Sequence, residues 1–151
     1  MAITSEQVKE LRDKTGISVI ECKKALEAAD GDMAKALGLL GLRATELAGK
    51  KGDRALAAGT VAAYVHGTGQ VGALVTLSCE TDFVSKNEEF VALARDIAMH
   101  VSAMRPADLA ELVGQQFIKD PSKTIADLLS GAVQKFGERT EVTGFSALSV
   151  K

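Results

Sequence analysis

The stretch SCETDFVSKNEEF, Ser78 to Phe90, decides how this chain folds, because a strand pattern changes to a helix pattern within it. Upstream, VGALVTLSC is apolar and rich in β-branched residues, which is typical of a buried strand. Downstream, Asn87 is a favourable N-cap, and two glutamates follow it in the expected first helical turn. Asp82 and Phe83 therefore fall in a short corner between strand and helix, where an aromatic residue is unexpected.

The sequence around this corner predicts an α+β core over residues 60–151. Two apolar runs flank Gly67-Thr68-Gly69, a pattern that favours a β-hairpin. A helix is expected over residues 88–104, another within residues 122–137, and a last strand in EVTGFSALSV. Three strands and at least two helices predict a three-stranded antiparallel sheet packed with helices on one face.

Residues 1–50 predict a separate, small three-helix (UBA-like) module. In its second helix the buried stripe is Val19, Cys22, Leu26 and Ala29. Ile20 lies about 100° around the helix from Val19, on the side expected to face water. Residues 51–59 are small and basic with repeated glycine, which indicates a tether between this docking module and the core.

Composition and charge exclude several classes of protein. The 151 residues are 46% hydrophobic and 25% charged, which is typical of a globular protein. The net charge is -2 and residues 55–151 have an acidic excess, so no nucleic-acid partner is expected. No signal sequence or apolar run of about 20 residues is present, so we expect no membrane partner and a cytoplasmic protein.

The sequence contains no recognisable enzyme template, metal site or cofactor site. GTGQVG lies within the predicted hairpin, where turn geometry explains its glycines better than phosphate binding. Cys22 and Cys79 are expected to be buried reduced thiols, since no CxxC pair occurs. His66 and Cys79 should lie at opposite ends of paired strands, too far apart to form a nucleophile pair.

His100 is the most distinctive residue of the predicted helix over residues 88–104. It falls at the edge of that helix's apolar stripe, and we expect it to be half-covered by the core while still projecting outward. Asp96 precedes it by one helical turn and could orient the imidazole.

The sequence resembles the elongation factor Ts family, the exchange factors for the translational GTPase elongation factor Tu. TDFVSKNEEF resembles the family signature TDFV-x-(K/R)-(N/D)-x-x-F, and VKELRDKTGISVIECKKALEAADGDMAKAL resembles the family's N-terminal module. YVHGTGQVGALV resembles the hairpin, DIAMHVSAMRP the helix that follows, and EVTGFSALSV the C-terminal strand. These motifs occur in family order over nearly the whole chain.

The resemblance implies a guanine-nucleotide exchange factor without catalytic residues, whose partner is elongation factor Tu. Asp82, Phe83 and Val84 would enter the partner's GTPase domain near its magnesium site, with Phe83 wedged between two helices. His100 would press toward the phosphate-binding loop, and GDP release would follow from the disturbed site. Docking would rest on a second set of residues, namely Val19, Ile20, Val71 and Gly72.

In one respect the chain departs from the long members of the family. In those proteins TDFV and IAMH lie in two half-domains separated by an insert, whereas here residues 90–104 join the two motifs directly. The sequence leaves open whether two chains pair as a homodimer through the sheet to replace the lost contacts. An alternative function also remains, in which a non-catalytic adaptor binds short peptides or ubiquitin-like domains through the three-helix module.

Overall fold

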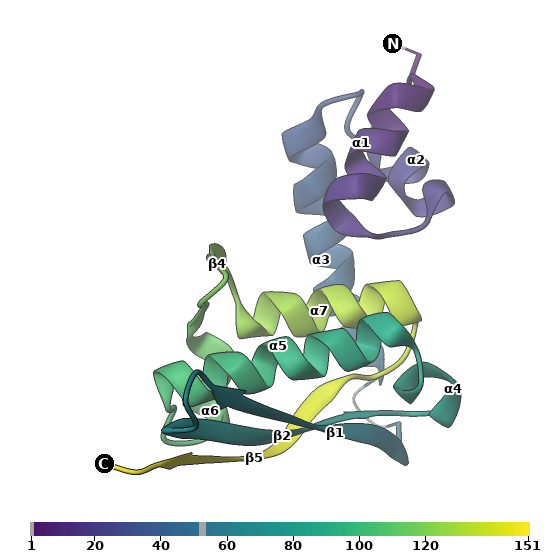
Figure 1. Cartoon of the computed structure of the whole chain (residues 1–151). Helices are drawn as coiled ribbons and strands as arrows, with labels where there is room; N and C mark the ends of the chain where they lie inside the picture. The colour runs from purple at the N-terminus through teal and green to yellow at the C-terminus, as the bar shows by residue number, and fades with distance from the viewer. Residues whose placement is uncertain (1, 52–53) are drawn as a thin grey trace. The chain divides into compact units, whose positions relative to one another are not determined.

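A computed structural model of the chain describes residues 2–51 and 54–151, with the side chains of residues 2–43 and 54–151. It confirms the α+β class: three N-terminal helices precede a three-stranded antiparallel sheet packed with helices (Figure 1). In chain order the elements are α1 (Ser5–Thr15), α2 (Val19–Ala28), α3 (Met33–Lys51), β1 (Ala58–His66), β2 (Val71–Cys79), α4 (Asp82–Ser85), α5 (Glu88–Met104), α6 (Leu109–Gly114), β3 (Gln116–Phe117), β4 (Asp120–Thr124), α7 (Ile125–Phe136) and β5 (Glu141–Ser149).

The chain forms two compact units. The first comprises Met1–Gly52 with Ser130–Gly137, and the second comprises Asp53–Leu129 with Glu138–Lys151. Of the tether expected at residues 51–59, residue 51 ends α3 and residues 58–59 open β1, while residues 52 and 53 lie outside the described part of the chain. Whether the first 50 residues fold apart from the rest stays a prediction.

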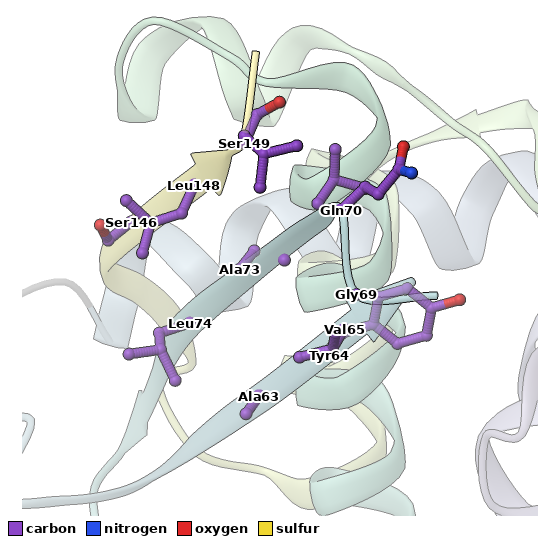
Figure 2. A pocket seen from close by; sticks show the side chains of 13 residues that line it. Ala63, Tyr64, Val65, Gly69, Gln70, Ala73, Leu74, Ser146, Leu148 and Ser149 are labelled. Atoms are coloured by element: carbon purple, nitrogen blue, oxygen red, sulfur yellow. The ribbon is translucent and has the colours of Figure 1, made fainter. Parts of the chain in front are cut away.

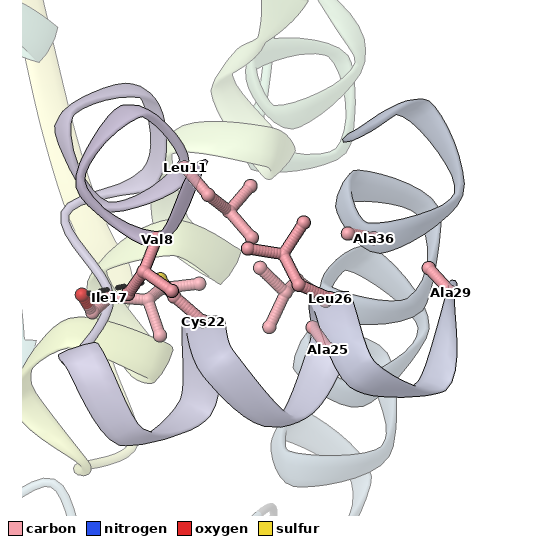
Figure 3. Packing of buried hydrophobic residues seen from close by; sticks show 9 residues of the cluster. Val8, Leu11, Ile17, Cys22, Ala25, Leu26, Ala29 and Ala36 are labelled. Carbon is pink, nitrogen blue, oxygen red and sulfur yellow. Dashed lines mark hydrogen bonds between the residues drawn. The ribbon is translucent and has the colours of Figure 1, made fainter. Parts of the chain in front are cut away.

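Local capping and a small apolar cluster organise the first unit. Thr4 caps α1, because its hydroxyl accepts from the backbone N–H of Gln7 at 3.2 Å while the Gln7 side chain accepts from the Thr4 N–H at 3.0 Å. The three helices enclose a core in which Leu11, Cys22 and Leu26 are fully buried (Figure 3). The small side chains of this cluster, Ala25, Ala29 and Ala36, let the helices approach closely.

The sheet of the second unit has the order β1-β2-β5, and all its strands are antiparallel. β1 and β2 form the expected hairpin, in register from Ala58 opposite Cys79 to His66 opposite Val71. Gly67 and Gly69 occupy the turn with positive φ of 52° and 89°, a conformation that glycine adopts without strain. β5 pairs with the other edge of β2, and the register shifts between Thr76 and Leu77.

Helix α5 packs across β1 and β2 on one face of this sheet (Figure 1). Asn87 caps the helix as expected, since its side-chain oxygen accepts from the Glu89 N–H at 2.9 Å. The stripe that meets the sheet is fully buried and contains Phe90, Ala94, Ile97 and Val101. The helix contacts β2, whose residues Val75 and Leu77 are also fully buried.

Short elements that the sequence does not predict complete the second unit. α6 follows α5, and β3 and β4 form a separate two-stranded sheet. They fill the stretch between α5 and α7 and bury Leu112 and Phe117. Among the described residues, no helix is both long and apolar enough to cross a membrane.

Replacing Phe90 with alanine should destabilise the protein strongly, because its ring is fully buried at the start of α5. We expect a loss of about 3–5 kcal/mol in the free energy of unfolding, measured by urea denaturation. The neighbouring Val91, which is exposed, supplies the control, and Val91→Ala should change stability by about 0.5 kcal/mol or less. Similar losses for both variants would contradict the described packing of α5.

Candidate functional site

The corner between β2 and α5 is a single helical turn rather than an open loop. α4 spans Asp82 to Ser85, and the Thr81 hydroxyl caps it by accepting from the Val84 N–H at 3.5 Å. Two residues later the Asn87 cap begins α5. Because both ends are capped within a few residues, the backbone of this corner (residues 80–85) has a defined conformation.

The side chains of the corner change abruptly from exposed to buried between Phe83 and Val84. Phe83 is 91% exposed, the most exposed large hydrophobic side chain in the described part of the chain. Asp82 beside it is also exposed, whereas Val84 and Ser85 are buried. A ring held out in water forgoes the favourable transfer of its apolar surface into a core. Such a position is typical of an aromatic residue that meets a partner.

Val84 therefore differs from the expectation that all three residues would contact a partner. Its side chain is 7% exposed and turns into the protein, which anchors the corner from beneath. The physical reason is the one-turn helix, which directs successive side chains about 100° apart. On this turn Phe83 therefore points outward while Val84 points inward.

Cys79 anchors the same corner at the end of β2. Its thiol is fully buried and donates to the carbonyl oxygen of Thr81 at 3.3 Å. Burial raises the pKa of this thiol, and the nearby Glu138 carboxylate raises the pKa further. The thiol consequently stays protonated at neutral pH and remains a hydrogen-bond donor. Cys22 is likewise buried and reduced, as expected.

His100 is fully buried, so the prediction of a half-covered, projecting side chain is wrong. Its Nδ1 accepts from the backbone N–H of Ile118 at 3.1 Å, which leaves the proton on Nε2 to be donated to the Gln115 side chain at 2.9 Å. The expected orientation by Asp96 is also wrong, because that carboxylate pairs with Lys119 at 2.9 Å. The segment around β3 covers the histidine, and sequence periodicity within α5 alone could not reveal this cover.

The expected docking residues of the first unit lie at the exposed start of α2. Ser18 caps this helix, accepting from the Glu21 N–H at 3.3 Å. Ile20 is 67% exposed, in agreement with its predicted outward position, whereas Val19 is 49% exposed rather than part of the buried stripe. Val19 borders a groove of about 300 Å³ between α1 and α2, whose rim is basic. The groove is lined by Ile3, Thr4, Ser5, Val8, Lys9, Arg12, Val19 and Lys23.

The other expected docking residues, Val71 and Gly72, begin β2 next to the hairpin turn. Both are partly buried, and a Cβ on Gly72 would lie 3.0 Å from the Tyr64 carbonyl oxygen, a tight contact that would require the neighbouring strand to shift slightly. The corner lies at the opposite end of the same strand, about 25 Å away at 3.3 Å per residue. The structure therefore brings Asp82 and Phe83 together but separates them from Val71 and Gly72.

The face of the sheet opposite α5 is apolar and uncovered. We call it the outer face; its exposed large side chains are Val61, Val65, Leu74, Leu148 and Val150. Part of it lines a shallow cavity of about 360 Å³ across all three strands (Figure 2). No ionisable side chain except the tyrosine hydroxyl lines this cavity. The sequence predicted helices on one face of the sheet but did not indicate which strand residues form the uncovered face.

The described residues show no arrangement for catalysis or metal binding. His66 and Cys79 lie at opposite ends of the β1-β2 ladder, as expected. Within residues 2–51 and 54–151, no group of three or more His, Cys, Asp and Glu side chains could hold a metal ion. The site consists of the exposed Phe83 ring next to the Asp82 carboxylate on a capped turn, a geometry suited to binding a partner.

Comparisons with known proteins identify one family. The family model for elongation factor TS matches residues 50–111 and again residues 80–151, so the corner and α5 fall within both matches. The elongation factor Ts of Desulfotalea psychrophila is 37% identical over 195 aligned positions, which cover 99% of each chain. That of Leptospira biflexa is 38% identical, covering 99% of this chain and 98% of the relative.

The relatives differ from this chain in length. The two alignments extend over 195 positions whereas this chain has 151 residues, so those proteins carry residues that are missing here. The elongation factor Ts of Trichlorobacter lovleyi is longer still: it is 43% identical over 149 positions, and the match covers 48% of its length.

Replacing His100 with alanine should destabilise the fold, because the Ile118 N–H and the Gln115 amide would lose a buried partner and a cavity would remain. We expect a loss of about 3 kcal/mol in the free energy of unfolding by urea denaturation. Asp96→Ala, which removes only an exposed ion pair, should cost less than about 1 kcal/mol. If the His100 variant kept its stability but bound the partner more weakly, His100 would instead contact the partner directly.

Proposed function

Because this chain belongs to the elongation factor Ts family, the nucleotide exchange factors for elongation factor Tu, we propose that its corner releases GDP from that partner. Like its family, the protein is a cytoplasmic factor of translation elongation and not an enzyme. The observation that carries the proposal is Phe83, whose ring is 91% exposed on a capped turn.

In the proposed complex Phe83 is the wedge and Asp82 is its polar neighbour. The ring enters between two helices of the GTPase domain near the magnesium site, and the carboxylate stays with it. Aromatic residues often supply the largest part of the binding energy at such interfaces. Because the corner is ordered before binding, little conformational entropy is lost when the partner closes around it.

GDP release then follows from the linkage between two ligands of one protein. The factor binds best when the magnesium and phosphate contacts of the partner are disturbed, and the nucleotide binds best when they are intact. Each ligand therefore weakens the other by the same factor. Typical couplings of about 1–3 kcal/mol correspond to roughly 5- to 150-fold.

Val84 and His100 have supporting roles in this proposal. Both are buried, so they act from within the protein rather than at the contact surface. Val84 anchors the turn that exposes Phe83. His100 ties the C-terminal part of α5 to the segment around β3 through its bonds to Gln115 and Ile118.

Docking is proposed to rest on surfaces away from the corner. Val19 and Ile20 offer exposed aliphatic side chains beside the basic groove of the first unit. Val71 and Gly72 would touch a second domain of the partner beside the hairpin turn. These contacts raise affinity without disturbing the nucleotide site, so they act on complex formation and not on the coupling.

When elongation factor Tu is not bound, two copies of this chain are proposed to pair through their outer faces, whose cavity Val71 and Gly72 help to line. Monomeric proteins rarely leave an apolar patch of more than a few hundred Å² exposed, and this face extends over three strands without a charged side chain among its cavity-lining residues. A second copy offers the same apolar face, as a two-fold interface requires. The relatives contain additional residues that this chain lacks. The same apolar face of a second copy could therefore cover the outer face here.

Phe83→Ala should impair exchange while leaving the fold intact. We expect complex formation with nucleotide-free elongation factor Tu to weaken by about 2 kcal/mol or more. The free energy of unfolding should change by about 0.5 kcal/mol or less, since the ring contacts little of its own protein. Release of labelled GDP, titrated against a fixed amount of loaded partner, measures the activity.

Ile20→Ala supplies the matched control for this titration. It should raise the concentration needed for half-maximal release and leave the saturated rate unchanged, whereas Phe83→Ala should lower the saturated rate. A Phe83 variant with a normal rate per folded molecule would refute the wedge.

Leu74→Lys should abolish pairing of two chains, because it places a charge at the centre of the outer face. The expected result is a dimer for the natural sequence and a monomer for the variant, measured by light scattering over a range of micromolar concentrations. Leu109→Lys, an exposed leucine of α6 outside this face, should leave the dimer intact. A natural protein that is monomeric throughout would rule out the pairing.

A further inference from the structure

We infer that Glu138, which lies just after α7, is a positioning residue that holds the corner in the conformation in which Phe83 projects. The inference rests on the proposed function of the corner and adds a residue 57 positions away from it in sequence. Glu138 is neither exposed like Phe83 nor part of the apolar core, and its hydrogen bonds reach the backbone immediately before Asp82.

The Glu138 carboxylate receives three hydrogen bonds from the strand end. One oxygen, Oε1, accepts from the backbone N–H of Glu80 at 3.1 Å and of Thr81 at 3.0 Å. The other, Oε2, accepts from the Thr81 hydroxyl at 2.7 Å. Hydrogen bonds to a charged group are about twice as strong as those between neutral groups. These bonds pair the N–H groups at the point where β2 ends and its ladder stops.

The third bond also determines how Thr81 caps α4. A hydroxyl has a single hydrogen, and the Thr81 hydroxyl directs it to Glu138. Its oxygen lone pairs therefore remain available to the Val84 N–H, 3.5 Å away. Glu138, Thr81 and Val84 thus form one chain of hydrogen bonds, from the carboxylate to the helical turn that exposes Phe83.

Glu80 makes the reciprocal connection from the corner back to the Glu138 segment. Its carboxylate accepts from the backbone N–H of Arg139 at 2.5 Å and pairs with the Arg54 guanidinium at 3.4 Å. The Arg139 guanidinium in turn donates to the Arg54 carbonyl oxygen at 2.6 Å and to Glu141. Each of the two segments therefore supplies a carboxylate to backbone N–H groups of the other.

This arrangement fixes the direction of the corner independently of the apolar core. Val84 and Ser85 hold the turn itself from below, and the Cys79 thiol holds the Thr81 carbonyl oxygen before it. The bonds to Glu138 fix the residues before the turn, so the direction of Phe83 is set before the partner arrives. A ring that must disturb a partner's site depends on this rigidity more than a docking side chain does. A mobile ring would change its own position on contact instead of displacing groups of the partner.

The test uses the full-length protein with Glu138→Ala and Glu138→Gln. Alanine removes all three bonds, and we expect the saturated rate of GDP release to fall roughly tenfold, or about 1.4 kcal/mol. Glutamine keeps one oxygen for the two backbone donors but presents an amide N–H group to Thr81, so we expect an intermediate loss. Glu111→Ala removes another carboxylate that accepts from a backbone N–H, that of Ala107 at 3.0 Å, and should leave the rate unchanged.

Combining substitutions separates a positioning role from a general loss of stability. In the Phe83→Ala background, Glu138→Ala should add little further loss of rate, because the group it positions is already absent. In the Ile20→Ala background its effect should remain full, since docking is independent of the corner. Equal effects in both backgrounds would overturn the inference.

Amide hydrogen exchange of the free protein gives a readout that needs no partner. In Glu138→Gln, and in Glu138→Ala if that variant folds, the amides of residues 80–86 should exchange faster while those of β1 and α5 keep their protection. Unchanged exchange at residues 80–86 would also overturn the inference. A natural protein that fails to accelerate GDP release would instead refute the proposed function, so the two failures are distinguishable.

Discussion

The burial of one stripe of α5 against β2 is the contact on which the rest of the second unit depends. Phe90, Ile97 and Val101 are fully buried in it, together with the strand residues Val75 and Leu77. Because strand and helix must both face this core, the chain between them has to reverse direction within a few residues. The single turn of α4 makes this reversal, and on it Val84 is buried while Phe83 is exposed.

Sequence patterns predicted the parts of this arrangement that depend on neighbours along the chain. The hairpin follows from Gly67 and Gly69, the start of α5 from Asn87, and the outward position of Ile20 from helical spacing. Phe83 could be recognised because an aromatic residue in a predicted corner lacks a local reason to be there.

The features that sequence reasoning missed depend on contacts between distant segments. His100 appeared to lie on an edge because the segment around β3, which covers it, had no predicted place. Glu138 gave no signal, since a single glutamate after a helix is ordinary and its partners lie 57 and 58 residues earlier. The burial of Val84 was not foreseen for a different reason: the motif was treated as one contact unit, although helical geometry divides its side chains between two sides.

The buried thiol of Cys79 has a consequence for the chemistry that this protein tolerates. Oxidants and alkylating agents attack the thiolate form of cysteine, and both protonation and burial suppress that form. A sulfenic acid or a disulfide at this position would remove the S–H donor beneath the corner. By keeping the sulfur protonated and enclosed, the fold preserves the S–H donor that holds the Thr81 carbonyl oxygen just before the turn of α4.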